Sequence, residues 1–251
     1  MYIPRAEYPN AEKKIIIFTG AGLSAPSGVS TFSGEKGIWN NHKIEDICDE
    51  NTWKKNFIMV HDFYNDIRTS LGEKEPSEGH KGIVRIVEKY GKENVYVITQ
   101  NIDNLLERAG VTPLHVHGEL TKMECEDCGQ NWNIGYNKFD IEKDKCPNCG
   151  SLKGVRPKIV FYNGAASMYS YMKRAFEHST NKDTIAVIIG TSGSVVSIDY
   201  NLKSSCKKIL CNMEPSPNID VEKIKFDKVY YESIETGIHK IEKDIEEWWT
   251  I

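Results

Sequence analysis

The stretch Tyr96-Val97-Ile98-Thr99-Gln100-Asn101-Ile102-Asp103-Asn104 decides how this chain folds and where it works. Its apolar beginning has the length and composition of a buried strand, and polar side chains follow directly. In an open α/β sheet, ligands bind just beyond the carboxyl ends of the strands. The polar residues therefore predict a binding site at a sheet edge, in preference to a simple polar turn.

An alternating segment, Leu114-His115-Val116-His117-Gly118, comes next along the chain. We expect only one of its two histidines, His115 or His117, to line the site. An amide, a carboxylate and an imidazole at one edge can polarise a substrate and move a proton. The two segments together favour a site of chemistry, with a surface histidine as the simpler alternative.

Several other apolar runs have the β-branched composition of strands buried on both faces of a parallel sheet. Helical patterns lie between several of them, such as residues 82–90 and 168–177. This alternation predicts an α/β fold with a doubly wound parallel sheet. The expected strands cover residues 14–18, 95–98, 185–189, 208–211 and 228–231, with 113–116 as a possible further one.

Composition and charge narrow the class of protein. The chain has 251 residues, of which 39% are hydrophobic and 27% charged, with a net charge of −4. One large domain, or one domain with a small insert, is expected at this length. The negative charge gives no support for binding nucleic acid or an anionic membrane. The first residues lack the apolar core of a signal peptide, and no apolar run could span a bilayer, so we expect a cytoplasmic protein.

Two C-x-x-C pairs, Cys125 with Cys128 and Cys146 with Cys149, form the strongest single pattern in the sequence. Two such pairs place four thiolates within tetrahedral reach of one Zn²⁺. Four sulfur ligands leave no open position, so the predicted zinc is structural, whereas a redox dithiol would need only one pair. The remaining thiols are expected to be inert and the remaining histidines to lie at the surface: Cys48, Cys206, Cys211, His42, His61, His80, His178 and His239.

The segment Thr19-Gly20-Ala21-Gly22-Leu23-Ser24 follows the first expected strand. Glycine allows backbone to turn tightly and approach a phosphate, and a following helix would supply amide donors. The dinucleotide pattern is incomplete, because Ala25 occupies its third glycine position, and no P-loop lysine follows. Further polar strand ends at 190–194 and 211–214 indicate a long ligand with many hydroxyls, such as a dinucleotide.

Taken in order, these motifs resemble the sirtuin family of NAD-dependent protein deacylases over roughly residues 10 to 245. The segments that carry the resemblance are GAGLSAPSG, TQNID, HVHGEL, the two C-x-x-C pairs, GVRPKIVFY, GTSGS and CNME. It implies a Rossmann-like NAD-binding domain at 1–37, 89–120 and 155–251. A smaller module would combine a helical insert at 38–88 with a zinc-binding insert at 121–154.

The resemblance also implies roles for individual residues. His117 would be the general base and Asn101 a second catalytic residue, while Val160 and Phe161 would line a channel for the acylated lysine. The substrate peptide would add as a strand between the 161–162 and 193–195 segments. The residues expected to bind NAD are Gly20, Ala21, Gly22, Ser24, Phe32, Gln100, Asn101, Ile102, Asp103, Gly190, Thr191, Ser192, Asn212 and Glu214.

The implied reaction consumes NAD. The acyl oxygen of an acyl-lysine protein or peptide attacks the nicotinamide ribose, nicotinamide leaves, and the acyl group moves to ADP-ribose. An NAD glycohydrolase or ADP-ribosyltransferase is the alternative on the same scaffold, and a nucleotide sensor without turnover is a third possibility.

Three positions depart from the pattern of the family. Ser33 stands where an arginine is common, and Tyr162-Asn163-Gly164 replaces the usual phenylalanine-glycine-glutamate. Members that prefer succinyl-type groups carry a tyrosine and, three residues on, an arginine. Here Tyr64 is followed by Ile67, with Arg68 one place further, so we expect apolar acyl groups, acetyl or longer.

Overall fold

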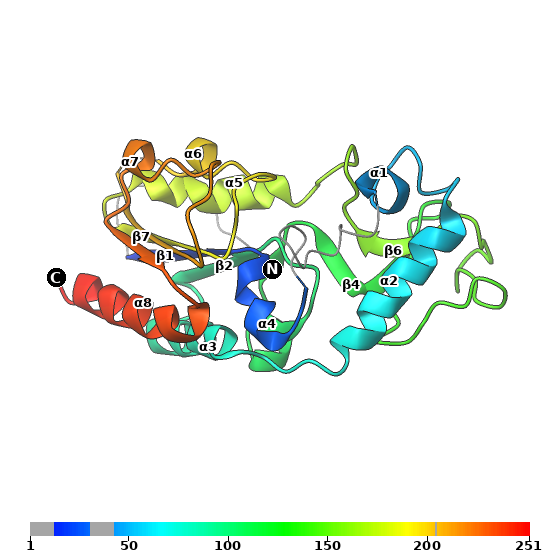
Figure 1. Ribbon diagram of the computed structural model, residues 1–251, viewed down its shortest axis with the longest axis horizontal. Coiled ribbons are helices and arrows are strands. Elements are labelled where there is room, and N and C mark those ends of the chain that lie inside the picture. Colours follow the sequence, from blue (N-terminus) through cyan, green and yellow to red (C-terminus); the bar gives the residue numbers. More distant parts are fainter. Residues whose placement is uncertain (1–12, 31–42, 204) are drawn as a thin grey trace.

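The computed structural model describes residues 13–30, 43–203 and 205–251. Three of the residues discussed above, Phe32, Ser33 and His42, lie outside these ranges. Figure 1 shows an elongated molecule with a large sheet and its helices at one end, and a smaller group of elements around α2, β4 and β6 at the other.

The large sheet is six-stranded, with the order β3-β2-β1-β7-β8-β9. Each neighbouring pair is parallel, and the central strand β1 pairs with both β2 and β7. All six predicted runs form strands of this sheet, which confirms the doubly wound α/β prediction. The strands are β1 Lys14–Thr19, β2 Val95–Thr99, β3 Leu114–His115, β7 Thr184–Ile189, β8 Lys207–Asn212 and β9 Lys228–Tyr231.

Helices cover both faces of the large sheet, as Figure 1 shows. On one face α3 (Glu78–Tyr90) and α8 (Ile234–Trp249) pack over alternate strand residues such as Ile15 and Ile17. On the other, α5 (Tyr169–Glu177) covers the intervening residues, including Ile16. Burial on both faces explains why the strands are apolar at every position. The short helices here are α4 Leu105–Ala109, α6 Ile198–Asn201, α7 Val221–Ile224 and the 3₁₀ turn η4 His178–Thr180.

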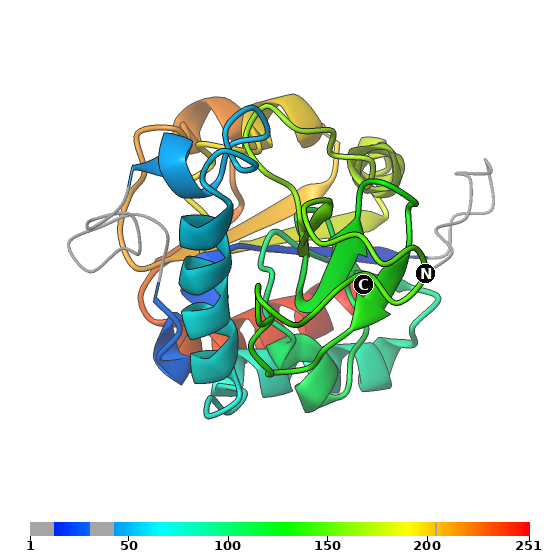
Figure 2. The ribbon, with the colours of Figure 1, turned by 90° about the vertical axis from the view of Figure 1, so that its right-hand side faces the viewer.

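The smaller group of elements has its own antiparallel sheet of order β5-β4-β6. Figure 2 shows α2 standing beside this sheet in the view from its end of the molecule. The side chains between them, including Trp53, Tyr64 and Phe161, form a separate apolar cluster. The elements are β4 Gly118–Cys125, β5 Asn131–Asn133, β6 Val155–Ile159, α1 Ile44–Ile47 and α2 Phe57–Leu71.

The division of the chain into an NAD domain and a small module stays a prediction, and two elements lie across its expected limits. Helix α3 falls almost wholly within the expected helical insert, yet its Ile83 and Ile86 pack in the core of the large sheet. Strand β6 falls in the expected NAD domain, yet it pairs with β4 of the small sheet. Boundaries between the two parts near residues 77, 117 and 160 agree better with these contacts.

Among the described residues, none of the helices combines the length and the apolar character needed to cross a bilayer.

Candidate functional site

The carboxyl ends of β1, β2 and β7 meet at one edge of the large sheet. The hydroxyl of Thr19 donates to that of Thr99 at 2.8 Å, and the backbone N–H of Gln100 donates to the Thr19 carbonyl at 2.9 Å. These bonds extend the pairing of β1 with β2 by one residue beyond the end of β2. The first polar residues after β2 are therefore held beside the glycine segment after β1.

The glycine segment packs directly against the loop that follows β7. The Gly22 N–H donates to the Gly190 carbonyl at 2.9 Å, and a Cβ at position 22 would lie 2.5 Å from Gly190 Cα. Gly190 itself has a φ of +60°, which favours glycine. Contact between two backbones is thus one reason for glycine here. The expected α-helix start is wrong, because two 3₁₀ turns follow, Ala21–Leu23 and Ala25–Ser27.

Ser24 connects this segment to the polar residues after β2. Its buried hydroxyl donates to Asp103 Oδ2 at 2.8 Å and accepts from the Asn101 side-chain amide at 3.0 Å. Burial raises the pKa of Asp103, although bonds from the Leu105 N–H and Ser24 oppose the shift. Asn101, Asp103 and Ser24 therefore form one hydrogen-bonded group, as their shared place at the sheet edge predicts.

Gln100 extends the polar group toward β7 and β8. Its side-chain amide donates to the Thr191 hydroxyl at 2.9 Å. Asn212, at the end of β8, accepts from the Thr191 N–H at 3.1 Å and donates to its carbonyl at 2.9 Å. Two further predicted residues, Ser192 and Glu214, lie exposed just beyond the same strand ends.

His117 lies beside this group, directly before β4. Its Nδ1 is 3.1 Å from the Gln100 carbonyl oxygen and its Nε2 is 2.8 Å from the Tyr169 hydroxyl. A carbonyl can only accept, so Nδ1 carries the proton and Nε2 is the basic nitrogen. Burial lowers the pKa of His117 below its usual value, against a smaller opposing effect of the Gln100 carbonyl. The ring is therefore neutral at pH 7 and able to accept a proton.

His115 has a different environment from His117, because β3 ends at His115 and the chain bends at residues 116–117 before β4 begins. Its Nδ1 is 2.8 Å from the Asn101 carbonyl oxygen and its Nε2 is 2.8 Å from Glu107 Oε1. Both neighbours only accept, so this geometry suits a doubly protonated ring. Burial acts to lower the pKa of His115, but the hydrogen bond and charge of Glu107 outweigh it, and the pKa is raised. His115 thus fixes the backbone of Asn101.

Two histidines expected at the surface are buried. His61 is 1% exposed and stacks on Phe139, and His80 is fully buried. His80 Nδ1 accepts from the Ser77 N–H at 3.1 Å, and its Nε2 lies 3.4 Å from the Ser24 hydroxyl. Burial lowers the pKa of both His61 and His80 to about 4.

His80 is thus a site residue that sequence reasoning missed. Its spacing from Ile83 and Ile86 on one helical face could have indicated burial.

The chemistry of this edge fits a dinucleotide. Hydroxyl, amide and carboxylate groups follow one another from Ser24 through Asn101 and Gln100 to Thr191 and Asn212. Such groups suit the hydroxyls and amide of NAD. Ala21 and Gly22, both half-exposed, add at most a methyl group at the turn, so a ligand can approach the backbone there. The half-buried Ile102 packs toward the small module instead.

The four paired cysteines gather as predicted. Their sulfur atoms all lie within 4.8 Å of one another, with Cys125 to Cys149 at 3.7 Å and Cys128 to Cys146 at 3.6 Å. Sulfurs around a tetrahedral Zn²⁺ with bonds of about 2.3 Å lie roughly 3.8 Å apart, whereas a disulfide needs about 2 Å. Each pair ends in a glycine with φ of +73°, Gly129 and Gly150. The three other cysteines are buried, as expected.

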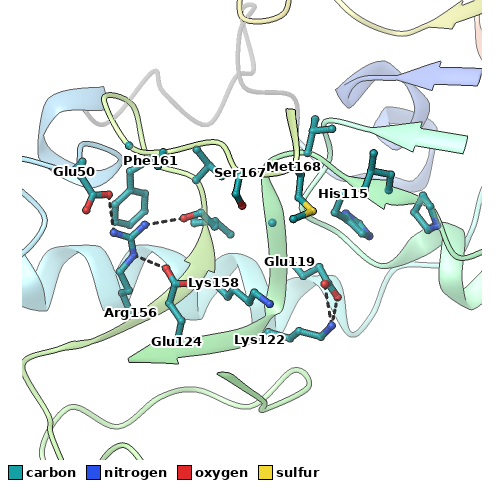
Figure 3. Close-up of a pocket in the computed structure, with 18 of the residues that line it drawn as sticks. Glu50, His115, Glu119, Lys122, Glu124, Arg156, Lys158, Phe161, Ser167 and Met168 are labelled. Carbon is teal, nitrogen blue, oxygen red and sulfur yellow. Dashed lines mark hydrogen bonds and ion pairs between the residues drawn. The ribbon is translucent and has the colours of Figure 1, made fainter. Parts of the chain in front are cut away.

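A cavity of about 910 Å³ lies between the β3 edge of the large sheet and the small sheet. Figure 3 shows His115 and Met168 on one side of it, and Arg156 with Phe161 on the other. Val160 and Phe161, the predicted channel residues, also contribute to the lining. Val160 is tied to the sheet edge that carries the polar group, because its N–H donates to the His117 carbonyl at 2.9 Å.

Arg68 is fully buried and engaged with the protein itself. Its Nε donates to the Leu120 carbonyl at 2.8 Å and its Nη1 to Asn65 Oδ1 at 2.7 Å. Burial lowers the pKa of Arg68 to about 10. Tyr64 is 1% exposed and stacks on Phe161. Neither side chain is free to meet an acidic acyl group.

Asn163, which stands where the family commonly has a glycine, adopts a backbone conformation that favours glycine. Its φ is +62°, and its side chain donates to Asp49 Oδ2 at 2.6 Å. Asparagine tolerates this left-handed region better than most residues. The changed segment therefore retains a glycine-like turn.

Comparison with known proteins agrees with this geometry. The model of the Sir2 family matches residues 20–197. An NAD-dependent protein deacylase of Helicobacter hepaticus is 38% identical over 257 residues, which cover 94% of this chain and 98% of the relative. A mutant Sir2 homologue solved with ADP-ribose has a TM-score of 0.81 at 25% identity, covering 96% of this chain and 95% of that one. A Sir2 homologue–NAD complex has a TM-score of 0.78 at 25% identity, covering 95% and 91%.

Proposed function

This chain belongs to the Sir2 family, and we infer that it is an NAD-dependent protein deacylase with Asn101 and His117 as catalytic residues. Its substrate is an acyl-lysine protein or peptide, and the acyl group is transferred to ADP-ribose with release of nicotinamide. The observation that carries the assignment is the neutral His117, whose basic Nε2 lies at the same edge as the Ser24–Asn101–Asp103 group.

Each of these side chains has a task that follows from its contacts. NAD, when bound, supplies the ribose carbon at which the acyl oxygen attacks. Asn101 presents an amide whose orientation is fixed by Ser24 and by its backbone bonds to Thr99 and His115. His117 accepts the proton of the ribose hydroxyl, because its Nδ1 is protonated and its Nε2 is not. Gln100 orients that ring through its carbonyl.

The test measures nicotinamide release and deacylation of an acetyl-lysine peptide at millimolar NAD. Asn101→Ala and His117→Ala should each lower deacylation by about 100-fold or more. Asn137→Ala and His239→Ala, which change exposed residues away from this edge, serve as matched controls. Absence of peptide-dependent turnover by the unaltered protein would rule out the deacylase assignment.

The alternative, an NAD glycohydrolase or ADP-ribosyltransferase, rests on Ser33 and the Tyr162-Asn163-Gly164 segment. The left-handed Asn163 weakens that argument, because the segment still adopts a turn of the kind that glycine favours. Loss of NAD without peptide, abolished by Asn101→Ala, would favour this alternative. A sensor would bind ADP-ribose without turnover and keep its affinity in His117→Ala.

We propose that the acyl pocket prefers apolar groups. Arg68 donates to Leu120 and Asn65 instead of facing a ligand, and the half-buried Ile67 packs in the apolar cluster of the small module. Acetyl-lysine peptide should therefore be turned over faster than succinyl-lysine peptide by about tenfold or more, since an unpaired carboxylate in an apolar pocket is costly. Equal rates on the two peptides would refute this preference.

The zinc is structural, and Cys125, Cys128, Cys146 and Cys149 are its proposed ligands. A cytoplasmic location and the absence of nucleic-acid binding remain predictions from the sequence.

A further inference from the structure

Tyr169, the first residue of α5, makes a contact with His117 that the assignments above do not use. Its hydroxyl oxygen lies 2.8 Å from Nε2, and the two rings are tilted by 45° with centroids 5.8 Å apart. Because Nδ1 faces the Gln100 carbonyl, the lone pair of the ring is on Nε2. The phenol is therefore the donor, and it occupies the basic position of His117.

An unprotonated imidazole nitrogen has one lone pair in the ring plane, so a substrate hydroxyl cannot bond to Nε2 while Tyr169 does. The phenol can still accept, because its oxygen keeps acceptor capacity after it has donated its proton. A substrate hydroxyl can thus reach His117 either by displacing Tyr169 or through it.

The surroundings of Tyr169 favour the second route. Its half-buried ring packs against the core cluster that α5 forms with the large sheet. Its backbone N–H donates to the Ala166 carbonyl at 3.0 Å, which fixes the start of the helix. A ring anchored in this way holds its hydroxyl next to His117 when a ligand arrives.

We propose that Tyr169 is a further catalytic residue, which passes the proton of the ribose hydroxyl to His117. The ribose O–H bond breaks and its proton goes to the phenol oxygen, while the phenolic proton moves to Nε2. Tyr169 ends neutral, His117 becomes an imidazolium, and the ribose oxygen uses its freed electron pair to bond the acyl carbon, while the carbon–nitrogen π pair of the acyl-lysine moves onto its nitrogen. This step rests on the proposed function. Burial, with a smaller effect of Tyr162, raises the pKa of Tyr169, so the phenol is protonated at neutral pH.

The test compares Tyr169→Phe with Tyr171→Phe, a matched change of an exposed tyrosine in the same helix. Tyr169→Phe should lower deacylation by at least about tenfold, because one proton carrier is lost. It should leave peptide-dependent exchange of labelled nicotinamide into NAD unchanged, since that reaction precedes the proton transfer. Deacylation at or above the unaltered rate would overturn the proposal and indicate that Tyr169 merely caps the base.

A second readout needs no turnover. In protein labelled with ¹⁵N-histidine, Tyr169→Phe should move the Nε2 signal of His117, whereas Tyr171→Phe should not. An unchanged signal would show that the hydrogen bond does not form and would overturn the proposal. If the unaltered protein itself releases no nicotinamide with peptide, the proposed function fails, and the spectrum still reports on the Tyr169–His117 bond.

Discussion

The edge of the large sheet and the cysteine-rich end of the small sheet are ordered by different means. The large sheet lies between two extensive buried clusters, one on each face. The cysteine-rich end has a core of only Met123, Phe139, Val155 and two of the proposed zinc ligands, Cys125 and Cys146. Small cores rarely suffice for stability without a metal or a disulfide. Burial of apolar side chains thus orders the edge of the large sheet, whereas we expect metal ligation to hold the small sheet beside it.

Removal of zinc should cause the largest change of all. It should destabilise the small sheet and leave the core of the large sheet folded. Structural zinc in small domains contributes on the order of 10 kcal/mol. With chelator, or in Cys146→Ser, amides of β4 and β6 should exchange hydrogen rapidly while those of β1 and β7 stay protected. Deacylation should be lost, because His117 and Val160 border the small sheet.

The matched control is Cys206→Ser, a buried thiol outside the zinc cluster. If chelation made the amides of both sheets exchange equally fast, the large sheet would also depend on zinc, and this would contradict the expected difference between the two regions.

Replacement of His117 by alanine should separate activity from stability at the catalytic edge. Loss of a general base costs about 100- to 10,000-fold in rate, or about 3 to 5 kcal/mol of transition-state stabilisation. The melting temperature should change little, because the sheet core does not depend on this ring. A melting temperature that falls as steeply as with chelation would show that His117 acts as scaffold.

Two glycine substitutions, one in each region, compare how much stability depends on close backbone packing. In Gly22→Ala the new Cβ meets the Gly190 backbone at 2.5 Å, so unfolding free energy should fall by about 3 kcal/mol, with weaker NAD binding. In Gly129→Ala no atom lies within 4 Å of the new Cβ, and only the φ of +73° is unfavourable for alanine. The unfolding free energy should therefore fall by about 1 kcal/mol. Urea unfolding and NAD titration measure both. A larger cost at Gly129 would reverse the expected order.

The smallest expected effects come from pH, through the opposite shifts of His115 and His117. The pKa of His117 is lowered, so its contribution to stability is present above about pH 6.5 and lost as pH falls through its folded pKa. Deacylation should fall over the same acidic range. The pKa of His115 is raised, so its contribution is present below about pH 6.5 and lost as pH rises through its folded pKa.

His115→Gln tests the second shift. The stability lost relative to the unaltered protein should be greatest below about pH 6.5 and shrink as pH rises. A difference that grows with pH would contradict the charged His115–Glu107 pair.

Much of the fold was predictable because its signals are local. The apolar runs of the large sheet are buried on both faces, and a run such as 185–189 has no polar alternation to suggest any other class of structure. The four cysteines were predictable because C-x-x-C spacing by itself places sulfurs on one turn. His80 was missed, because a lone histidine in a helix shows no partner in sequence, and Ser24 approaches it only through the fold.

The sequence alone was enough to predict the parallel sheet, the polar strand ends and the cluster of four cysteines, since periodicity and spacing act over a few residues. Only the tertiary structure decided that Gly22 meets the backbone of Gly190, that Arg68 is committed to Leu120, and that Tyr169 donates to His117. These contacts join residues distant in sequence, and the packing of whole elements brings their atoms together. That packing also explains why two histidines only two residues apart, His115 and His117, have pKa values shifted in opposite directions.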